Sequence, residues 1–398
     1  MPTRRGWIAA ATGVAFIVGG RLFGLIELYV LGAVALTLVG VATLYVRTIK
    51  PAVSVDRLLH PRRVHAEGPS RADLYLRNLG PRPTPVLAIK DSFDKGSRSA
   101  RFLAAPLQRG DVSRAAYRLP TDRRGIFDVG PLEVRVADPF GFASSTTIAT
   151  DPTQLTVLPR VDVITPLPRT IGDDPHAGAT RASSLLGGGE DFYALRAYVQ
   201  GDDLRKVHWP STARLDDLMI RQDEMPWQAR ATVLLDLRKS VHDESSLEQA
   251  VSAAASIFEA CRRSNSLIRL VTTDGTDSSF ASGEQHAEAV LEHLATVQAS
   301  RGDRLALAAG ALRRSGNGGA CAVVTTSQAS RADLDSLVGL TATFSQVYLV
   351  LFDRRLSPAA PAPAIGDTSG VVVRVAPGRS FAPAWNQALA IARSGRRR

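Results

Sequence analysis

The segment 187–209, GGGEDFYALRAYVQGDDLRKVHW, contains the residue types of this chain that could do chemistry. A glycine-rich loop can bind phosphates, but this one lacks the lysine and the Ser or Thr of a phosphate-binding loop and the G-x-G-x-x-G spacing. Asp202 or Asp203, His208 and Ser211 are the residue types of a nucleophilic triad. They are crowded together, and no nucleophile elbow surrounds the serine. The sequence therefore favours neither nucleotide binding nor a triad, and a hydrolase using Asp202, Asp203 and His208 is kept as the alternative function.

The same segment alternates arginines with acidic residues and aromatic residues. Arg196, Arg205 and Arg214 are equally spaced, and three acidic pairs lie before, among and after them, at 190–191, 202–203 and 216–217. Such a segment can close on itself through charge-assisted and bidentate pairs. Arginine and aromatic side chains also dominate the binding energy of protein interfaces. The pattern predicts either an ordered wedge between two domains or a docking face for another protein.

This pattern also resembles the signature of a bacterial membrane family called domain of unknown function 58. The residues that carry the resemblance are Gly189, Asp191, Phe192, Arg196, Tyr198, Gly201, Asp202, Arg205, Trp209 and Arg214. The stretch RGIFDVGPLEVRVADPFGF at 124–142 is similar to the same family's approach to its signature. The resemblance implies a membrane anchor, a von Willebrand factor A-like domain at the C-terminal end, and a MoxR-type AAA+ ATPase as partner in complex assembly or cell-envelope processes.

The resemblance raises the question of a metal site, because von Willebrand factor A-like domains bind a divalent ion through Asp-x-Ser-x-Ser after their first strand. Here the corresponding residues are DLRKS at 236–240, in which Asp236 and Ser240 match. Arg238 takes the place of the middle serine, and a guanidinium repels a cation and fills its space. Ser327 replaces a later aspartate of the pattern. We expect neither Mg²⁺ nor another cofactor, and we expect Asp236 to pair with Arg238 or a neighbouring cation; a metal-dependent ligand-binding domain is a further alternative.

Two apolar segments at the N-terminus predict how the chain is held in the cell. The segments 7–25 and 28–46 are each about as long as the 20 residues that span a bilayer. They are separated by so few residues that they must form a tight hairpin, and no signal-peptide cleavage pattern follows the first. Arg4, Arg5 and Arg47 flank the hairpin, whereas its connecting loop has no Lys or Arg. By the positive-inside rule, both termini are predicted to be cytoplasmic.

The region 51–160 consists of short alternating runs broken by Gly, Pro, Asn and Asp. Leu132 and Val134, for example, alternate with charged residues, as in a half-buried strand. Strands at this spacing predict an antiparallel β-sandwich. The DPFG turn that follows is expected to pack Phe140 and Phe142 onto this sandwich.

The rest of the chain predicts a linker followed by an α/β domain. The transmembrane hairpin is assigned to 1–50, the linker with the signature to 161–227, and the α/β domain to 228–398. In the last region, the apolar run 231–236 suits a strand buried on both faces, and alanine-rich 247–263 suits a helix. Alternating strands and helices of this kind predict a doubly wound parallel sheet.

Composition narrows the classes of partner. The net charge is +10, but the arginines are scattered and rarely interleave with aromatic residues, so no nucleic-acid partner is expected. Cys261 and Cys321 are too few for a disulfide framework or a thiolate metal site. Taken together, the sequence and the resemblance predict a non-enzymatic, membrane-anchored cytoplasmic adaptor that binds other proteins.

Overall fold

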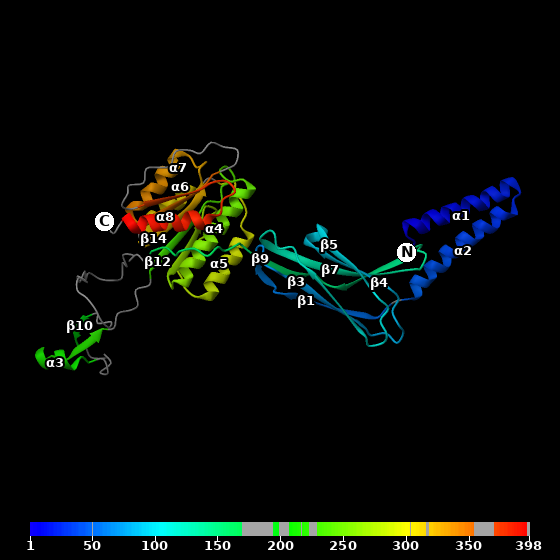
Figure 1. Ribbon diagram of the computed structural model, residues 1–398, viewed down its shortest axis with the longest axis horizontal. Helices are drawn as coiled ribbons and strands as arrows, with labels where there is room; N and C mark the ends of the chain where they lie inside the picture. The colour runs from blue at the N-terminus through cyan, green and yellow to red at the C-terminus, as the bar shows by residue number, and fades with distance from the viewer. Residues whose placement is uncertain are drawn as a thin grey trace. The chain divides into compact units, whose positions relative to one another are not determined.

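The structure is a computed structural model that divides into two compact units. The residues it describes are 1–49, 51–168, 194–198, 207–215, 217–222, 229–302, 304–315, 318–353 and 370–395. The N-terminal unit comprises Met1–Arg160 with Leu294–Thr296, and the C-terminal unit comprises Val161–His293 with Val297–Arg398. Each unit has its own sheets and its own core, and each is described by itself (Figure 1).

The N-terminal unit begins with two apolar helices, α1 (Arg4–Phe23) and α2 (Ile26–Thr48), as predicted. Helix α1 begins earlier than the apolar segment does, because the Thr3 side chain accepts a hydrogen bond from the Gly6 amide at 3.1 Å and caps the helix. Gly24, with φ of 69°, ends it in the left-handed conformation that glycine tolerates. Both helices are long and apolar enough to cross a membrane, which is compatible with membrane anchoring.

The helices pack on each other through glycine. A methyl group on Gly32 would lie 2.6 Å from the carbonyl oxygen of Gly13, so the two backbones approach closely at this point. Large apolar side chains lie on the outside of the pair, among them Val14, Val34 and Val41. The hairpin therefore buries small residues internally and exposes its large ones.

The strands of the N-terminal unit form two sheets. One is antiparallel, with the order β1-β3-β6, and the other has the order β2-β9-β7-β4-β5, with β8 also paired to β7. Their bounds are β1 (Val53–His60), β2 (Arg63–His65), β3 (Arg71–Asn78), β4 (Leu87–Phe93), β5 (Arg98–Ala104), β6 (Val112–Arg118), β7 (Gly125–Ala137), β8 (Ser144–Thr150) and β9 (Thr153–Leu158), with a short 3-10 turn η1 (Asp94–Gly96). The alternation predicted around Leu132 is confirmed, because Leu132, Val134 and Val136 are buried while Arg135 is exposed.

The two sheets share one core. Leu74 of β3, Leu87 of β4 and Leu132 of β7 belong to the same buried apolar cluster. A buried ion pair crosses between the sheets, because Arg57 of β1 contacts Asp91 of β4 at 2.8 Å. Apolar packing and this pair together hold the sheets against each other.

The prediction that Phe140 and Phe142 pack onto these sheets is wrong for Phe140, whose exposed fraction is 63%. Its ring stacks on Phe142, with centroids 6.0 Å apart. Phe142 in turn packs with Ala143 and with residues of α2 rather than with the sheet core. The reason is that the residues before α1 hydrogen-bond to this loop and hold it against the helices.

The C-terminal unit contains a parallel sheet covered by helices. The strands are β12 (Arg230–Leu235), β13 (Leu267–Thr272), β14 (Ala320–Thr326), β15 (Gln346–Phe352) and β16 (Gly370–Val375), in the order β13-β12-β14-β15-β16. The helices are α4 (Glu244–Arg263), α5 (Glu284–Thr296), α6 (Leu305–Ser315), α7 (Arg331–Val338) and α8 (Phe381–Gly395), with a 3-10 turn η3 (Gly339–Ala342). The predicted alternation of strands and helices and their parallel pairing are confirmed.

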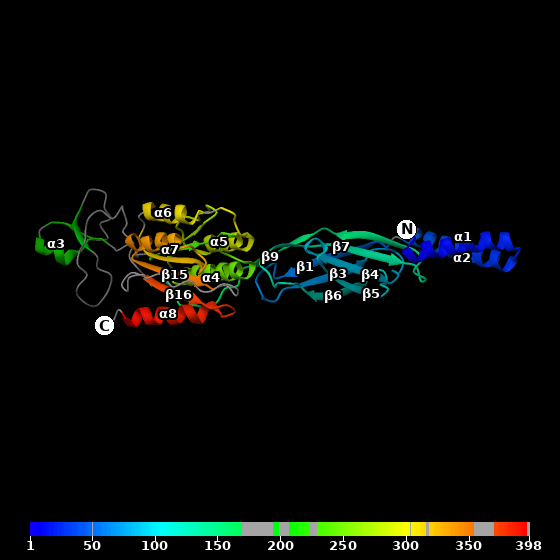
Figure 2. The same ribbon diagram turned by 90° about the horizontal axis from the view of Figure 1, so that it is seen from above.

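Helices lie on both faces of this sheet (Figure 2). In β15, Val347 and Leu349 pack in the cluster that includes α6 and α7. Tyr348, between them, contacts Trp385 of α8 instead, with ring centroids 5.5 Å apart. Because successive strand residues point to opposite faces, a strand covered on both sides must be apolar throughout, which explains the continuous apolar runs of the sequence.

Candidate functional site

The predicted signature residues are described only in part. Gly189, Asp191, Phe192, Gly201, Asp202 and Arg205 lie outside the described residues. Of the others, Arg196 lies in β10 (Ala194–Ala197), which pairs antiparallel with β11 (Met219–Gln222). Trp209 begins α3 (Trp209–Leu215), with Arg214 near the end of this helix.

These signature elements are joined by backbone hydrogen bonds. The Tyr198 amide donates to the Leu218 carbonyl at 2.7 Å, and the His208 amide donates to the Met219 carbonyl at 2.8 Å. The structure therefore brings the segment around Tyr198 and the start of α3 to one two-stranded ladder. On that helix Trp209 has an exposed fraction of 68%.

His208 and Ser211, two members of the proposed triad, do contact each other. The His208 ring nitrogen Nδ1 lies 2.9 Å from the Ser211 hydroxyl. The amides of Ser211 and Thr212 both donate to the His208 carbonyl at 3.1 Å, so His208 stands where α3 begins. These contacts join His208 to the first turn of α3, as the residue before a helix commonly does. Asp202 and Asp203 lie outside the described residues, and the hydrolase stays an untested prediction.

The topology of the parallel sheet indicates a second place to look for a site. The chain leaves β12 toward β13 on one side, then returns to β14 on the other side of β12. Open α/β sheets bind ligands at such a switch point, outside the carboxyl ends of the strands. Leu235, the last residue of β12, pairs with Thr272 of β13 and with Val324 of β14. The next residue, Asp236, therefore lies between the ends of both neighbouring strands.

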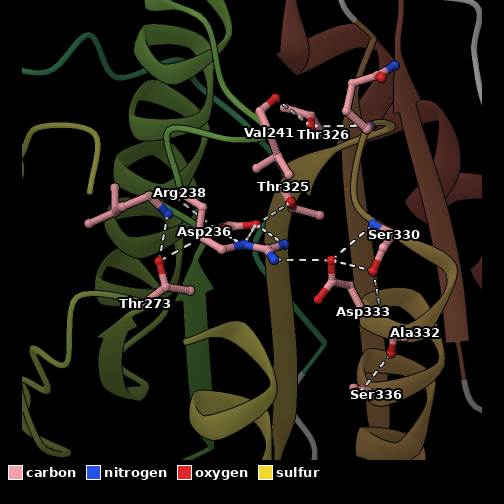
Figure 3. Close-up of polar contacts among 12 residues, drawn as sticks. Asp236, Arg238, Val241, Thr273, Thr325, Thr326, Ser330, Ala332, Asp333 and Ser336 are labelled. Carbon is pink, nitrogen blue, oxygen red and sulfur yellow. Dashed lines mark hydrogen bonds and ion pairs between the residues drawn. The ribbon is translucent and has the colours of Figure 1, made fainter. Parts of the chain in front are cut away.

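Asp236 is fully buried at this edge and is held by side chains from three strands or their ends (Figure 3). Arg238 donates to it from Nε at 3.1 Å and from Nη2 at 3.0 Å. The Thr325 hydroxyl donates at 2.8 Å and the Thr273 hydroxyl at 3.5 Å. The predicted pairing of Asp236 with Arg238 is confirmed, and the arginine side chain itself is only 3% exposed.

Arg238 also connects this carboxylate to a second one. Its Nη1 atom lies 3.1 Å from Asp333 of α7, as Figure 3 shows. Asp333 in turn accepts from the amide and the hydroxyl of Ser330, which caps the helix. Burial raises the pKa of Asp333, but the Ser330 hydrogen bonds and the Arg238 charge outweigh it and leave the pKa below its usual value. One guanidinium thus bridges two carboxylates from different elements.

The guanidinium of Arg238 lies against the carboxylate that would be the first ligand of a von Willebrand factor A-like metal site. Ser240 is exposed, whereas Asp236 is fully buried, and no hydrogen bond between them is found among the described residues. Within the same residues, no group of three or more His, Cys, Asp or Glu side chains could hold a metal ion. His242, buried close by, has a lowered pKa because burial disfavours its charged form despite the charge of Asp236. The donor set is therefore poor in the free carboxylate oxygens that a divalent ion requires.

Sequence reasoning found Asp236 and Arg238 but not the residues that complete the cluster. Asp333 comes from a helix far along the chain, and its only local signal is S-x-x-D at 330–333, which marks a helix start. Thr273 directly follows β13 and Thr325 is the last but one residue of β14, and the register of these strands had to be known before either could be placed beside Asp236.

Comparison with known proteins relates part of the chain to a family. The model of the family described as protein of unknown function DUF58 matches residues 194–358, and this match supports membership of the family. The match covers β10, α3 and β11 as well as the cluster around Asp236. No curated protein matches the chain.

Similarities to solved structures are weak. The CARDB domain of a Pyrococcus furiosus protein, in complex with di-metal ions, is 12% identical with a TM-score of 0.20, covering 27% of this chain and 93% of that one. A β-glucosidase from Erythrobacter marinus is 12% identical with a TM-score of 0.19, covering 27% of this chain and 16% of that one. Cwp6 from Clostridium difficile is 7% identical with a TM-score of 0.17, covering 75% and 49%. Scores this low support no argument about fold or function.

Proposed function

We propose that this protein is a membrane-anchored adaptor that binds other proteins at the cytoplasmic face and carries out no chemistry of its own. The apolar helices α1 and α2 hold it in the bilayer, and basic Arg4, Arg5 and Arg47 keep both termini in the cytoplasm. The two sheets of the N-terminal unit act as a β-sandwich spacer. The C-terminal unit, which we interpret as von Willebrand factor A-like, presents the binding surface.

The observation that carries this proposal is the closure of the sheet edge by Arg238. In an open α/β sheet this edge is where a ligand or metal is expected. Here Asp236 already accepts hydrogen bonds from Arg238, Thr325 and Thr273. Because the carboxylate and the guanidinium satisfy each other in a buried place, neither is available to bind a metal or move a proton. The site therefore favours a structural role and a binding function over catalysis.

The signature segment supplies the surface for a partner. Trp209 is the large aromatic residue of α3, and more than half of its surface is exposed. The same helix carries Arg214, and exposed tryptophan and arginine are the residue types that interface hot spots favour. The family resemblance suggests a MoxR-type AAA+ ATPase as the partner, in complex assembly or cell-envelope processes.

Co-purification of this ATPase with the full-length chain in detergent tests the proposal. Replacing a hot-spot tryptophan costs about 2 kcal/mol or more, which is roughly a 30-fold loss of affinity. We expect Trp209→Ala to lose the ATPase. Leu307→Ala is the matched control, because Leu307 on α6 is also 68% exposed. Equal capture by Trp209→Ala and the wild type would count against the docking surface.

A further inference from the structure

The loop between β7 and β8 is bound to the first residues of the chain. The Thr3 amide donates to the Phe142 carbonyl at 2.7 Å, and the Thr3 hydroxyl donates to the Gly141 carbonyl at 2.6 Å. The N-terminal ammonium donates to the Ser144 carbonyl at 2.8 Å, and the Ser144 amide donates back to the Met1 carbonyl at 3.0 Å. The start of α1 is thus fixed directly to this loop.

The same loop also contacts both apolar helices. A methyl group on Gly6 of α1 would lie 2.1 Å from the Phe142 carbonyl oxygen, so only glycine permits this approach. Ala143 is buried in one cluster with Ala42 and Val46, near the end of α2. The loop therefore lies at the level where α1 begins and α2 ends, as Figure 1 shows by the position of the N-terminus.

The loop is rigid by its own hydrogen bonds. The Asp138 side chain accepts from the Phe140 amide at 2.9 Å and from the Ala143 amide at 2.5 Å. A carboxylate that accepts two backbone amides fixes the turn between them. At the tip of this fixed turn, Phe140 is 63% exposed and stacks on Phe142.

We propose that Phe140 inserts into the interfacial layer of the cytoplasmic leaflet, and that the loop 138–143 rests on the membrane. This inference rests on the proposed membrane anchor. Trp7 follows Gly6 directly and is 66% exposed, and one residue of helix rises only about 1.5 Å, so an aromatic belt lies at the same level. Arg4 and Arg5, also exposed, supply cations for anionic headgroups there.

Contact with lipid accounts for the exposed apolar tip without any protein partner. A rigid, apolar tip continuous with two lipid-facing helices needs no further partner to be buried, because the headgroup boundary accepts aromatic rings. The contact also sets the orientation of the N-terminal unit, since the loop is held by hydrogen bonds to Thr3 and by packing against α2. The loop would act as a third point of support beside the two helices.

Spin labelling of the full-length protein in lipid vesicles tests this inference. The native cysteines do not interfere, because Cys261 and Cys321 are buried and burial raises the pKa of each to about 12. The probes are Phe140→Cys, Val34→Cys and Ile126→Cys, each carrying a nitroxide, in vesicles of phosphatidylcholine with some phosphatidylglycerol. Oxygen enters the bilayer and a nickel chelate stays in water. The ratio of a label's collision rate with oxygen to its collision rate with the nickel chelate therefore reports how deep the label lies in the membrane.

The labels at 34 and 126 separate two outcomes. In one, the helices do not enter the membrane; in the other, they enter it but Phe140 does not. Val34 is exposed near the middle of α2 and reports the hydrocarbon. Ile126 is exposed at the opposite end of β7 from the loop, about 35 Å along the strand, and reports water. If the label at 34 is as accessible to nickel as the label at 126, the membrane anchor itself is wrong.

With the anchor in place, we expect the label at 140 to collide with oxygen several-fold more, relative to nickel, than the label at 126 does. A ratio at 140 equal to that at 126 would overturn the inference. Shielding from both reagents would also overturn it, because contact with a second copy of the chain, and not lipid, would then cover Phe140.

Discussion

The buried pair of Asp236 and Arg238 gives the sharpest test of how the C-terminal unit is held together. In Arg238→Met, Asp236 would keep the hydrogen bond from Thr325 and lose all its contacts with the guanidinium. Both side chains are almost completely buried, so water cannot replace the lost partner. Removing one member of a buried pair costs about 3–5 kcal/mol. We expect the free energy of unfolding to fall by that amount.

The assay is urea unfolding of the full-length protein in detergent, followed by hydrogen exchange of peptides that cover β12 and β14. Arg263→Met is the control, because Arg263 is more than half exposed and pairs with Glu259 one helical turn away. Glu259 keeps Arg262 as a partner in this variant, at 2.7 Å, and an i,i+4 pair on a helix contributes only about 0.3–0.5 kcal/mol. The control should therefore leave the unfolding midpoint almost unchanged.

The double variant Asp236→Asn with Arg238→Met separates a true pair from two independent residues. Asparagine can still accept from Thr325, and no charge is left at position 236. Asp333 loses Arg238 both in Arg238→Met and in the double variant, so this loss cancels when the two are compared. We expect the double variant to be more stable than Arg238→Met alone, with a coupling of about 1–3 kcal/mol. If the stability losses of the two substitutions simply add, or if Arg238→Met costs less than about 1 kcal/mol, then Asp236 and Arg238 do not stabilise the fold as a buried pair.

Three other predictions concern pH, thiols and the helical hairpin. The pKa of Asp333 is lowered on folding, so its contribution to stability is present above about pH 4 and is lost as the pH falls through the folded value; acid titration of the unfolding midpoint should show this loss, and Asp333→Asn should flatten it. At pH 8, Cys261 and Cys321 should react with a thiol reagent only after urea unfolds the protein, because burial raises each pKa to about 12; reaction in the native state would contradict their burial. Gly32→Leu should separate α1 from α2, whereas Gly40→Leu should not, because a methyl group on Gly40 meets nothing within 4 Å; distances between spin labels on the two helices measure this, and equal effects would contradict the packing.

Local sequence patterns predicted the elements of this protein because each pattern reports one physical requirement. The alternation around Leu132 reports a strand with one buried face, and the unbroken apolar run before Asp236 reports a strand covered on both. The pairing of Asp236 with Arg238 was predictable because the residues are only two positions apart. Local patterns of this kind require no knowledge of the tertiary fold.

What the sequence could not predict depends on contacts between distant segments. Asp333 reaches Arg238 only because β14 lies beside β12 and the chain then enters α7. The DPFG turn after a strand predicts that Phe140 packs onto the sandwich, but the pairing of Thr3 with Gly141 and Phe142 turns the loop toward the helices. Neither contact leaves a periodic signal in the sequence.

The central claim is that the chain is an adaptor that binds an ATPase through the surface around Trp209. Its most direct test is an equilibrium titration of the purified MoxR-type ATPase onto the full-length chain in lipid nanodiscs. We expect saturable binding that Trp209→Ala weakens roughly 30-fold and Leu307→Ala leaves unchanged. Absence of saturable binding, or equal affinity of the wild type and Trp209→Ala, would contradict it.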